Sequence, residues 1–211
     1  CFKNGSLSRE RMKDLYGLTW TDVSRILQET PPGNEGKIIL PYIFPEIVPL
    51  VLEPHIYRFG LKKGDIEGNI RGFIEAQFLS MRLHSRWINE RPSKIIATGG
   101  ASKNREILQV LADIFQAPVE RYKIPDSAAL GAAFRAAFSY YHSKNSHISW
   151  EDIVKEFLNQ FKTDNISPNT NLKNLYDDMM ELYQKFENYI LNKGHNPEEA
   201  RIRFIKDHFN K

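Results

Sequence analysis

Residues 94–115 read KIIATGGASKNREILQVLADIF, and this stretch decides the expected fold. Ile95–Ala97 is a short apolar run, long enough for a strand that is buried on both faces. The run stops at Gly99 and Gly100, and from residue 107 to residue 115 the apolar residues recur with the period of a helix. The stretch therefore predicts a strand, a two-glycine turn and a helix.

The two-glycine turn has two interpretations. Glycines can take positive φ and let a ligand approach the backbone, and a helix start offers free N–H groups and the positive end of its dipole, which suits a nucleotide. Asn104 lies in the expected first turn, behind an N-cap at Ser102, where its carboxamide can donate and accept. The alternative is a tight turn with nothing bound. The spacing favours neither, because it is neither a GxGxxG fingerprint nor a Walker loop.

The segment ATGGASKNREILQVLADIFQAPV, which starts at Ala97, resembles the adenosine-binding segment of the FGGY carbohydrate kinases. Three other stretches resemble the same family in the same order, and the members that act on D-xylulose are the most similar. These stretches are CFKNGSLSRE at Cys1, TWTDVSRILQ at Thr19 and FIEAQFLSMRLHS at Phe73. The likeness extends from Cys1 to about Tyr141.

The alternation of strand and helix predicts an α/β fold. The resemblance implies, more specifically, the actin-like, ribonuclease-H-like ATPase domain with a C-terminal helical appendage. Residues 1–145 are expected to be the ATP-binding C-terminal domain of an FGGY kinase, without its first part. Residues 146–211 are expected to form a helical C-terminal extension. The chain is then the C-terminal part of a longer protein and packs against an N-terminal domain that precedes Cys1.

The resemblance assigns ATP binding to five residues: Trp20, Gly99, Gly100, Ala101 and Asn104. Trp20 matches a tryptophan that borders the nucleotide site in the family, where its flat face can pack against adenine. A core aromatic at a helix entrance is the alternative, and it is the commoner role of a single tryptophan.

No catalytic residue is assigned in this chain. The family uses an aspartate as its base, which is expected upstream of Cys1, and no aspartate of this sequence matches it. No metal ligands are assigned either, because His55 has no partner at a ligand spacing.

The implied reaction transfers the γ-phosphoryl group of ATP to a hydroxyl of a ketopentose, D-xylulose, and gives D-xylulose 5-phosphate. Mg²⁺ would neutralise the phosphates. The alternatives are an FGGY kinase for another sugar or polyol, and a non-catalytic nucleotide-binding module of the same fold. The 211-residue piece alone is expected to be inactive.

The composition is that of an ordinary globular domain, with 41% apolar and 26% charged residues. The net charge of +3 is too small to indicate a nucleic-acid partner. A single cysteine, Cys1, excludes an internal disulfide framework and fits a reducing compartment, so a cytoplasmic location is expected. No apolar run approaches the ~20 residues that span a bilayer, so no membrane partner is expected.

Other patterns predict further elements. Glu75, Gln77 and His84 form a polar group that is expected at a solvated helix edge. Gly131 lies in an alanine-rich helix and is expected where that helix packs closely against a sheet. The expected elements are strands at 1–7 and 117–124, helices at 65–90, 127–141, 150–161 and 172–191, and a turn at 165–171.

Overall fold

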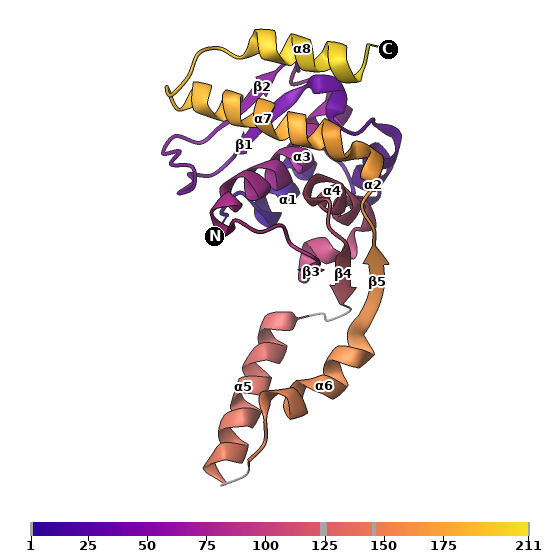
Figure 1. Ribbon diagram of the computed structural model, residues 1–211, viewed down its shortest axis with the longest axis vertical. Coiled ribbons are helices and arrows are strands. Elements are labelled where there is room, and N and C mark those ends of the chain that lie inside the picture. The colour runs from indigo at the N-terminus through magenta and orange to yellow at the C-terminus, as the bar shows by residue number, and fades with distance from the viewer. Residues whose placement is uncertain (1, 123–125, 145–146, 211) are drawn as a thin grey trace.

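The computed structural model describes residues 2–122, 126–144 and 147–210, without the side chains of Ala101, Tyr122 and residues 156–164. Helices and two small sheets alternate along it (Figure 1). The helices are α1 (Ser6–Leu15), α2 (Trp20–Glu29), α3 (Ile66–His84), α4 (Arg105–Phe115), α5 (Ser127–Ser143), α6 (Trp150–Phe161), α7 (Lys173–Ile190) and α8 (Glu198–His208). The strands are β1 (Ile38–Tyr42), β2 (His55–Phe59), β3 (Ile95–Ala97), β4 (Val119–Tyr122) and β5 (Lys162–Ile166). Short 3₁₀ turns are η1 (Asn34–Gly36), η2 (Arg86–Ile88), η3 (Gly100–Lys103) and η4 (Thr170–Leu172).

The two sheets are built differently. Strands β1 and β2 pair antiparallel, with Ile38 opposite Phe59. In the other sheet β4 is central, parallel to β3 and antiparallel to β5. Parallel neighbours need a crossover connection, and α4 supplies it between β3 and β4. The predicted order of strand, glycine turn, helix and strand is thus confirmed for this segment.

Helix α3 is the central element and contacts α1, α2, α4, α7 and β1 (Figure 1). Its start is confirmed at Asp65, whose Oδ1 accepts a hydrogen bond from the Gly68 N–H at 2.9 Å. Helix α7 packs on α3 and contributes Tyr176, Tyr183 and Phe186 to the same hydrophobic core. The expected boundary at residues 145 and 146 stays a prediction, although segments on both sides of it share this core.

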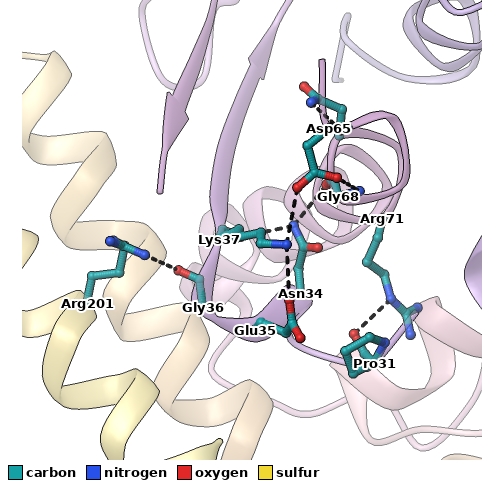
Figure 2. A network of polar contacts seen from close by, with 10 residues as sticks. Pro31, Asn34, Glu35, Gly36, Lys37, Asp65, Gly68, Arg71 and Arg201 are labelled. Atoms are coloured by element: carbon teal, nitrogen blue, oxygen red, sulfur yellow. Dashed lines mark hydrogen bonds and ion pairs between the residues drawn. The ribbon is translucent and has the colours of Figure 1, made fainter. Parts of the chain in front are cut away.

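The loop that follows α2 is held tightly against α3. Residues 33–36 all have positive φ, between 48° and 79°, which is uncommon outside glycine. Figure 2 shows the contacts that stabilise this path: Asn34 Nδ2 donates to the Gly68 carbonyl at 2.9 Å, and Arg71 Nε donates to the Pro31 carbonyl at 3.3 Å. The end of α2 is therefore fixed to the central helix.

The prediction that Glu75 and Gln77 lie at a solvated helix edge is wrong. Glu75 and Gln77 are buried, because α3 is covered by other elements on several sides and has no solvated edge at these residues. Glu75 Oε1 accepts from the Gly33 N–H and the Tyr176 hydroxyl, both at 2.9 Å. Its pKa is raised by burial. His84 is half-buried, with Nε2 at 3.1 Å from a carboxylate oxygen of Glu187.

Three predictions about strands and turns differ from the structure. Strand β3 is not buried on both faces: it lies at the edge of its sheet, and Ile96 is 53% exposed. Residues 2–5 form no strand, since a turn leads directly into α1 at Ser6. The turn expected at 165–171 begins later, because Ile166 still pairs with Val119 in the sheet.

Helices α5 and α6 lie apart from the main body (Figure 1). No residue of α5 is buried, and no described atom lies within 4 Å of the position that a Cβ on Gly131 would take. The expected close packing of α5 against a sheet is therefore not present among the described residues. Its contacts are with α6, where the rings of Phe138 and Trp150 stack at 4.3 Å between centroids.

Within the described residues, no helix combines the length and the apolar character that crossing a bilayer requires.

Candidate functional site

A cavity of about 810 Å³ opens where α1, α2 and the start of α4 meet. This volume is typical of small-molecule sites. The three elements lie together because each buries residues in the same hydrophobic core: Met12 from α1, Val23 from α2 and Ile107 from α4. The lining residues are Ser6, Arg9 and Glu10 from α1, Trp20, Thr21, Ser24 and Gln28 from α2, and Gly100 and residues 103–107 from η3 and α4.

Three of the five residues expected to bind ATP line this cavity: Trp20, Gly100 and Asn104. Gly99 precedes the lining and is not part of it. Ala101 lies in η3, and its side chain is outside the described part of the structure. Residues that are 80 or more positions apart in the chain are thus brought together around one space.

The two glycines differ in what the backbone requires of them. Gly99 has φ of +80°, in the left-handed region that favours glycine. Gly100 has no positive φ, and a Cβ on it would meet no described atom within 4 Å. Neither the turn nor packing inside the chain therefore requires a glycine at position 100, whereas a ligand in the cavity would benefit from its bare backbone.

Asn104, and not Ser102, caps α4. Its Oδ1 accepts from the N–H groups of Glu106 and Ile107, both at 3.1 Å. Ser102 lies inside η3 and donates its hydroxyl to the Gly99 carbonyl at 2.7 Å. The other end of the Asn104 carboxamide donates from Nδ2 to Ser24 Oγ at 2.8 Å. The amide at the cavity wall is therefore held at both ends.

Trp20 is a surface residue of the cavity and not a core aromatic. It begins α2 and is 41% exposed. A capping box fixes this start: Asp22 N–H donates to Thr19 Oγ1 at 3.2 Å, and Thr19 N–H donates to Asp22 Oδ2 at 2.8 Å. The hydrogen bonds from Thr19 lower the pKa of Asp22. Lys13 Nζ lies 5.7 Å from the Trp20 ring centroid, a cation–π distance.

Arg9 was missed by the sequence reasoning. Its half-buried guanidinium lines the cavity, and burial lowers its pKa to about 10, so it stays cationic at neutral pH. Among the described side chains no carboxylate pairs with it, and its contact is with the Phe78 ring at 5.8 Å. The stretch CFKNGSLSRE contains this residue, but nothing in the spacing shows that it reaches the glycine turn.

The cavity lining is net cationic. Arg9, Lys103 and Arg105 carry positive charge, and the carboxylates in the lining are Glu10 and Glu106. Glu106 Oε1 accepts a hydrogen bond from Gln28 Nε2 at 3.1 Å, which joins α4 to α2. An open lining whose cationic groups pair with no described carboxylate favours an anionic ligand.

The described residues do not by themselves form a metal site. No three His, Cys, Asp or Glu side chains come together among them in an arrangement that could hold an ion. Mg²⁺, which the resemblance implies, prefers carboxylates together with substrate phosphates. No step is therefore assigned to a metal held by this part of the chain.

Comparison with known proteins identifies the family. Residues 36–140 match the C-terminal domain model of the FGGY family of carbohydrate kinases. Xylulose kinase from Rattus norvegicus is 34% identical over 208 residues, covering 94% of this chain and 38% of the rat protein. Xylulose kinase 2 from Arabidopsis thaliana is 32% identical over 220 residues, covering 92% of this chain and 39% of that protein. The chain thus spans about two fifths of the length of these relatives.

Solved structures of sugar and gluconate kinases share the fold. The ligand-bound xylulose kinase from Lactobacillus acidophilus superposes with a TM-score of 0.75 at 23% identity, over 90% of this chain and 39% of that one. The gluconate kinase from the same organism gives 0.73 at 24% identity, with the same coverage. The family model, the relatives and the shared fold agree, and this chain belongs to the FGGY family of carbohydrate kinases.

Proposed function

We propose that this chain is the nucleotide-binding part of a kinase that transfers the γ-phosphoryl group of ATP to D-xylulose and gives D-xylulose 5-phosphate. Family membership supports the reaction class, and the names of the rat and Arabidopsis relatives support the sugar. In this proposal the α/β body is the actin-like, ribonuclease-H-like domain of a longer cytoplasmic enzyme. A further domain would supply the base and most of the sugar site.

The observation that carries the proposal is the meeting of Trp20, Gly100 and Asn104 in one cavity. The exposed face of Trp20 is available for an adenine ring, since stacking on an aromatic face needs no particular base edge. The bare backbone at Gly100 lets the nucleoside approach closely. Adenosine therefore lies, in this proposal, between α2 and the start of α4.

The cationic lining supports the orientation of the phosphates. Arg9 has N–H donors that no described acceptor uses, and Lys103 also lines the cavity, from η3. A guanidinium binds phosphate oxygens through two parallel hydrogen bonds, which are among the stronger polar contacts. The α-phosphate and β-phosphate would accordingly lie toward α1.

A coupled ADP-release assay of the complete gene product tests this function. The candidate substrates compared are D-xylulose, D-ribulose, glycerol and gluconate, each with ATP and Mg²⁺. We expect the highest kcat/KM with D-xylulose. A higher value with another substrate would identify an FGGY kinase of different specificity. ATP binding without release of ADP in the presence of any sugar would indicate a non-catalytic nucleotide-binding module.

A further inference from the structure

A continuous hydrogen-bonded link joins two walls of the cavity through a residue that has no assigned role. Ser24 lies one turn after Trp20 on α2 and donates its hydroxyl proton to the Trp20 carbonyl at 3.1 Å. The same oxygen accepts from Asn104 Nδ2 at 2.8 Å. The link therefore runs from the backbone of Trp20, through one hydroxyl, to the cap of α4.

The chemistry of this hydroxyl determines how the Asn104 amide is oriented. A serine hydroxyl has one proton, and Ser24 donates it in a hydrogen bond to the Trp20 carbonyl. Its oxygen can therefore only accept a hydrogen bond from Asn104. Asn104 must then present its NH₂ group to Ser24 and its oxygen to the N–H groups of α4. A flipped amide would place an NH₂ against those N–H groups and an oxygen against the Ser24 lone pairs.

We infer that Ser24 is a positioning residue of the nucleotide site: it holds the Asn104 carboxamide, and with it the start of α4, at a fixed distance from Trp20. This inference rests on the proposed function, because the distance is the width of the space that the nucleoside would occupy. Ser24 acts in it through Asn104 and not by touching the nucleotide.

The fold itself does not depend on this link. Helices α2 and α4 are joined by buried apolar residues, among them Val23, Ile26 and Ile107. Ser24 is half-buried at the cavity wall, and alanine is a better helix former than serine. A Ser24→Ala variant should therefore fold as well as the unsubstituted chain while losing the link, which separates positioning from stability.

The experiment is a calorimetric titration of ADP into the 211-residue chain and its variants, with thermal unfolding measured on the same samples. We expect Ser24→Ala to bind ADP about three- to tenfold more weakly, the usual effect of one hydrogen bond, with no fall in melting temperature. Ser24→Thr keeps the hydroxyl and should retain most of the affinity. Unchanged affinity in Ser24→Ala would overturn the inference.

A double-mutant cycle separates positioning from direct contact. Asn104→Ser keeps an oxygen that can cap α4, but its shorter side chain cannot reach Ser24. If Ser24 acts through Asn104, adding Ser24→Ala to this variant should change the affinity for ADP little further. Additive losses would show that the hydroxyl contacts the nucleotide itself and would overturn the inference. Absence of ADP binding by the unsubstituted chain would instead refute the proposed function, and the inference with it.

Discussion

Replacing Trp20 with alanine removes the aromatic wall of the cavity, and the loss can be estimated from its exposure. Trp20 is 41% exposed, so an adenine ring laid on it can cover roughly 80 Å² of a side chain of about 200 Å². At ~25 cal/mol per Å² that contact contributes about 2 kcal/mol. This agrees with the ~1–3 kcal/mol measured for bases stacked on aromatic side chains. We therefore expect ATP and ADP to bind about 30-fold more weakly to Trp20→Ala.

The assay for this prediction is a calorimetric ADP titration of Trp20→Ala and Trp20→Phe, with Trp87→Ala as the matched control. Trp87 is 80% exposed and does not line the cavity, so its replacement should leave the affinity unchanged. Phenylalanine keeps a smaller aromatic face and should give an intermediate affinity. In the complete enzyme, Trp20→Ala should raise the KM for ATP and leave that for the sugar nearly constant. A folded Trp20→Ala protein with undiminished affinity would refute the assignment of the adenine to this wall.

Three further predictions follow from the same structure. Gly100→Val should fold normally, because a Cβ there would meet no described atom within 4 Å. It should bind ADP at least ~10-fold more weakly. Equal affinity by calorimetry would show that Gly100 does not border the nucleotide. Burial raises the pKa of Glu75 above its ordinary value of 4.5, so the folded state holds the proton more tightly than the unfolded state. As the pH rises above about 4.5, the free energy of unfolding should therefore fall for the unsubstituted chain relative to Glu75→Gln. Urea unfolding at several pH values measures this difference. Parallel profiles of unfolding free energy against pH for the two proteins would contradict the direction of the shift. The 211-residue chain alone should release no ADP with D-xylulose, because it spans about 38% of the rat relative. Positioning of both substrates supplies much of the rate, and part of a site cannot provide it. Sugar-dependent turnover in the coupled assay would instead place a complete active site within this chain.

Local sequence patterns predicted the helices, because apolar periods and capping residues depend on residues close together in the chain. The apolar periods predicted α4 and α7 at nearly their observed extent, and Asp65 caps α3 as expected. The end of α3 was predicted wrongly: the helix expected over 65–90 stops at His84, and the turn η2 follows it. The choice between Ser102 and Asn104 as the cap of α4 was beyond such reasoning, because both residue types cap helices well. It is decided by η3, a turn of 3₁₀ helix that begins at Gly100 and delays the α-helix to Arg105.

Burial by distant segments is what the sequence could not show. The helical period marks one apolar face of α3, but Glu75 is covered by Tyr176, 101 positions later in the chain. Packing of distant segments also explains why part of the candidate site could not be predicted. The resemblance supplied Trp20, Gly100 and Asn104, whereas Arg9 and Ser24 reach the cavity only through the packing of α1 and α2 beside α4.

The central claim, that adenosine binds between α2 and the start of α4, is tested most directly by nuclear magnetic resonance. ADP is titrated into the ¹⁵N-labelled chain, and the shifts of the Trp20 indole N–H, the Gly99 and Gly100 amides and the Asn104 side-chain amide are followed. We predict that these signals move together, with one saturation curve, and further than those of Arg86 and Glu90, which do not line the cavity. Saturable binding that leaves these signals unmoved would contradict the claim.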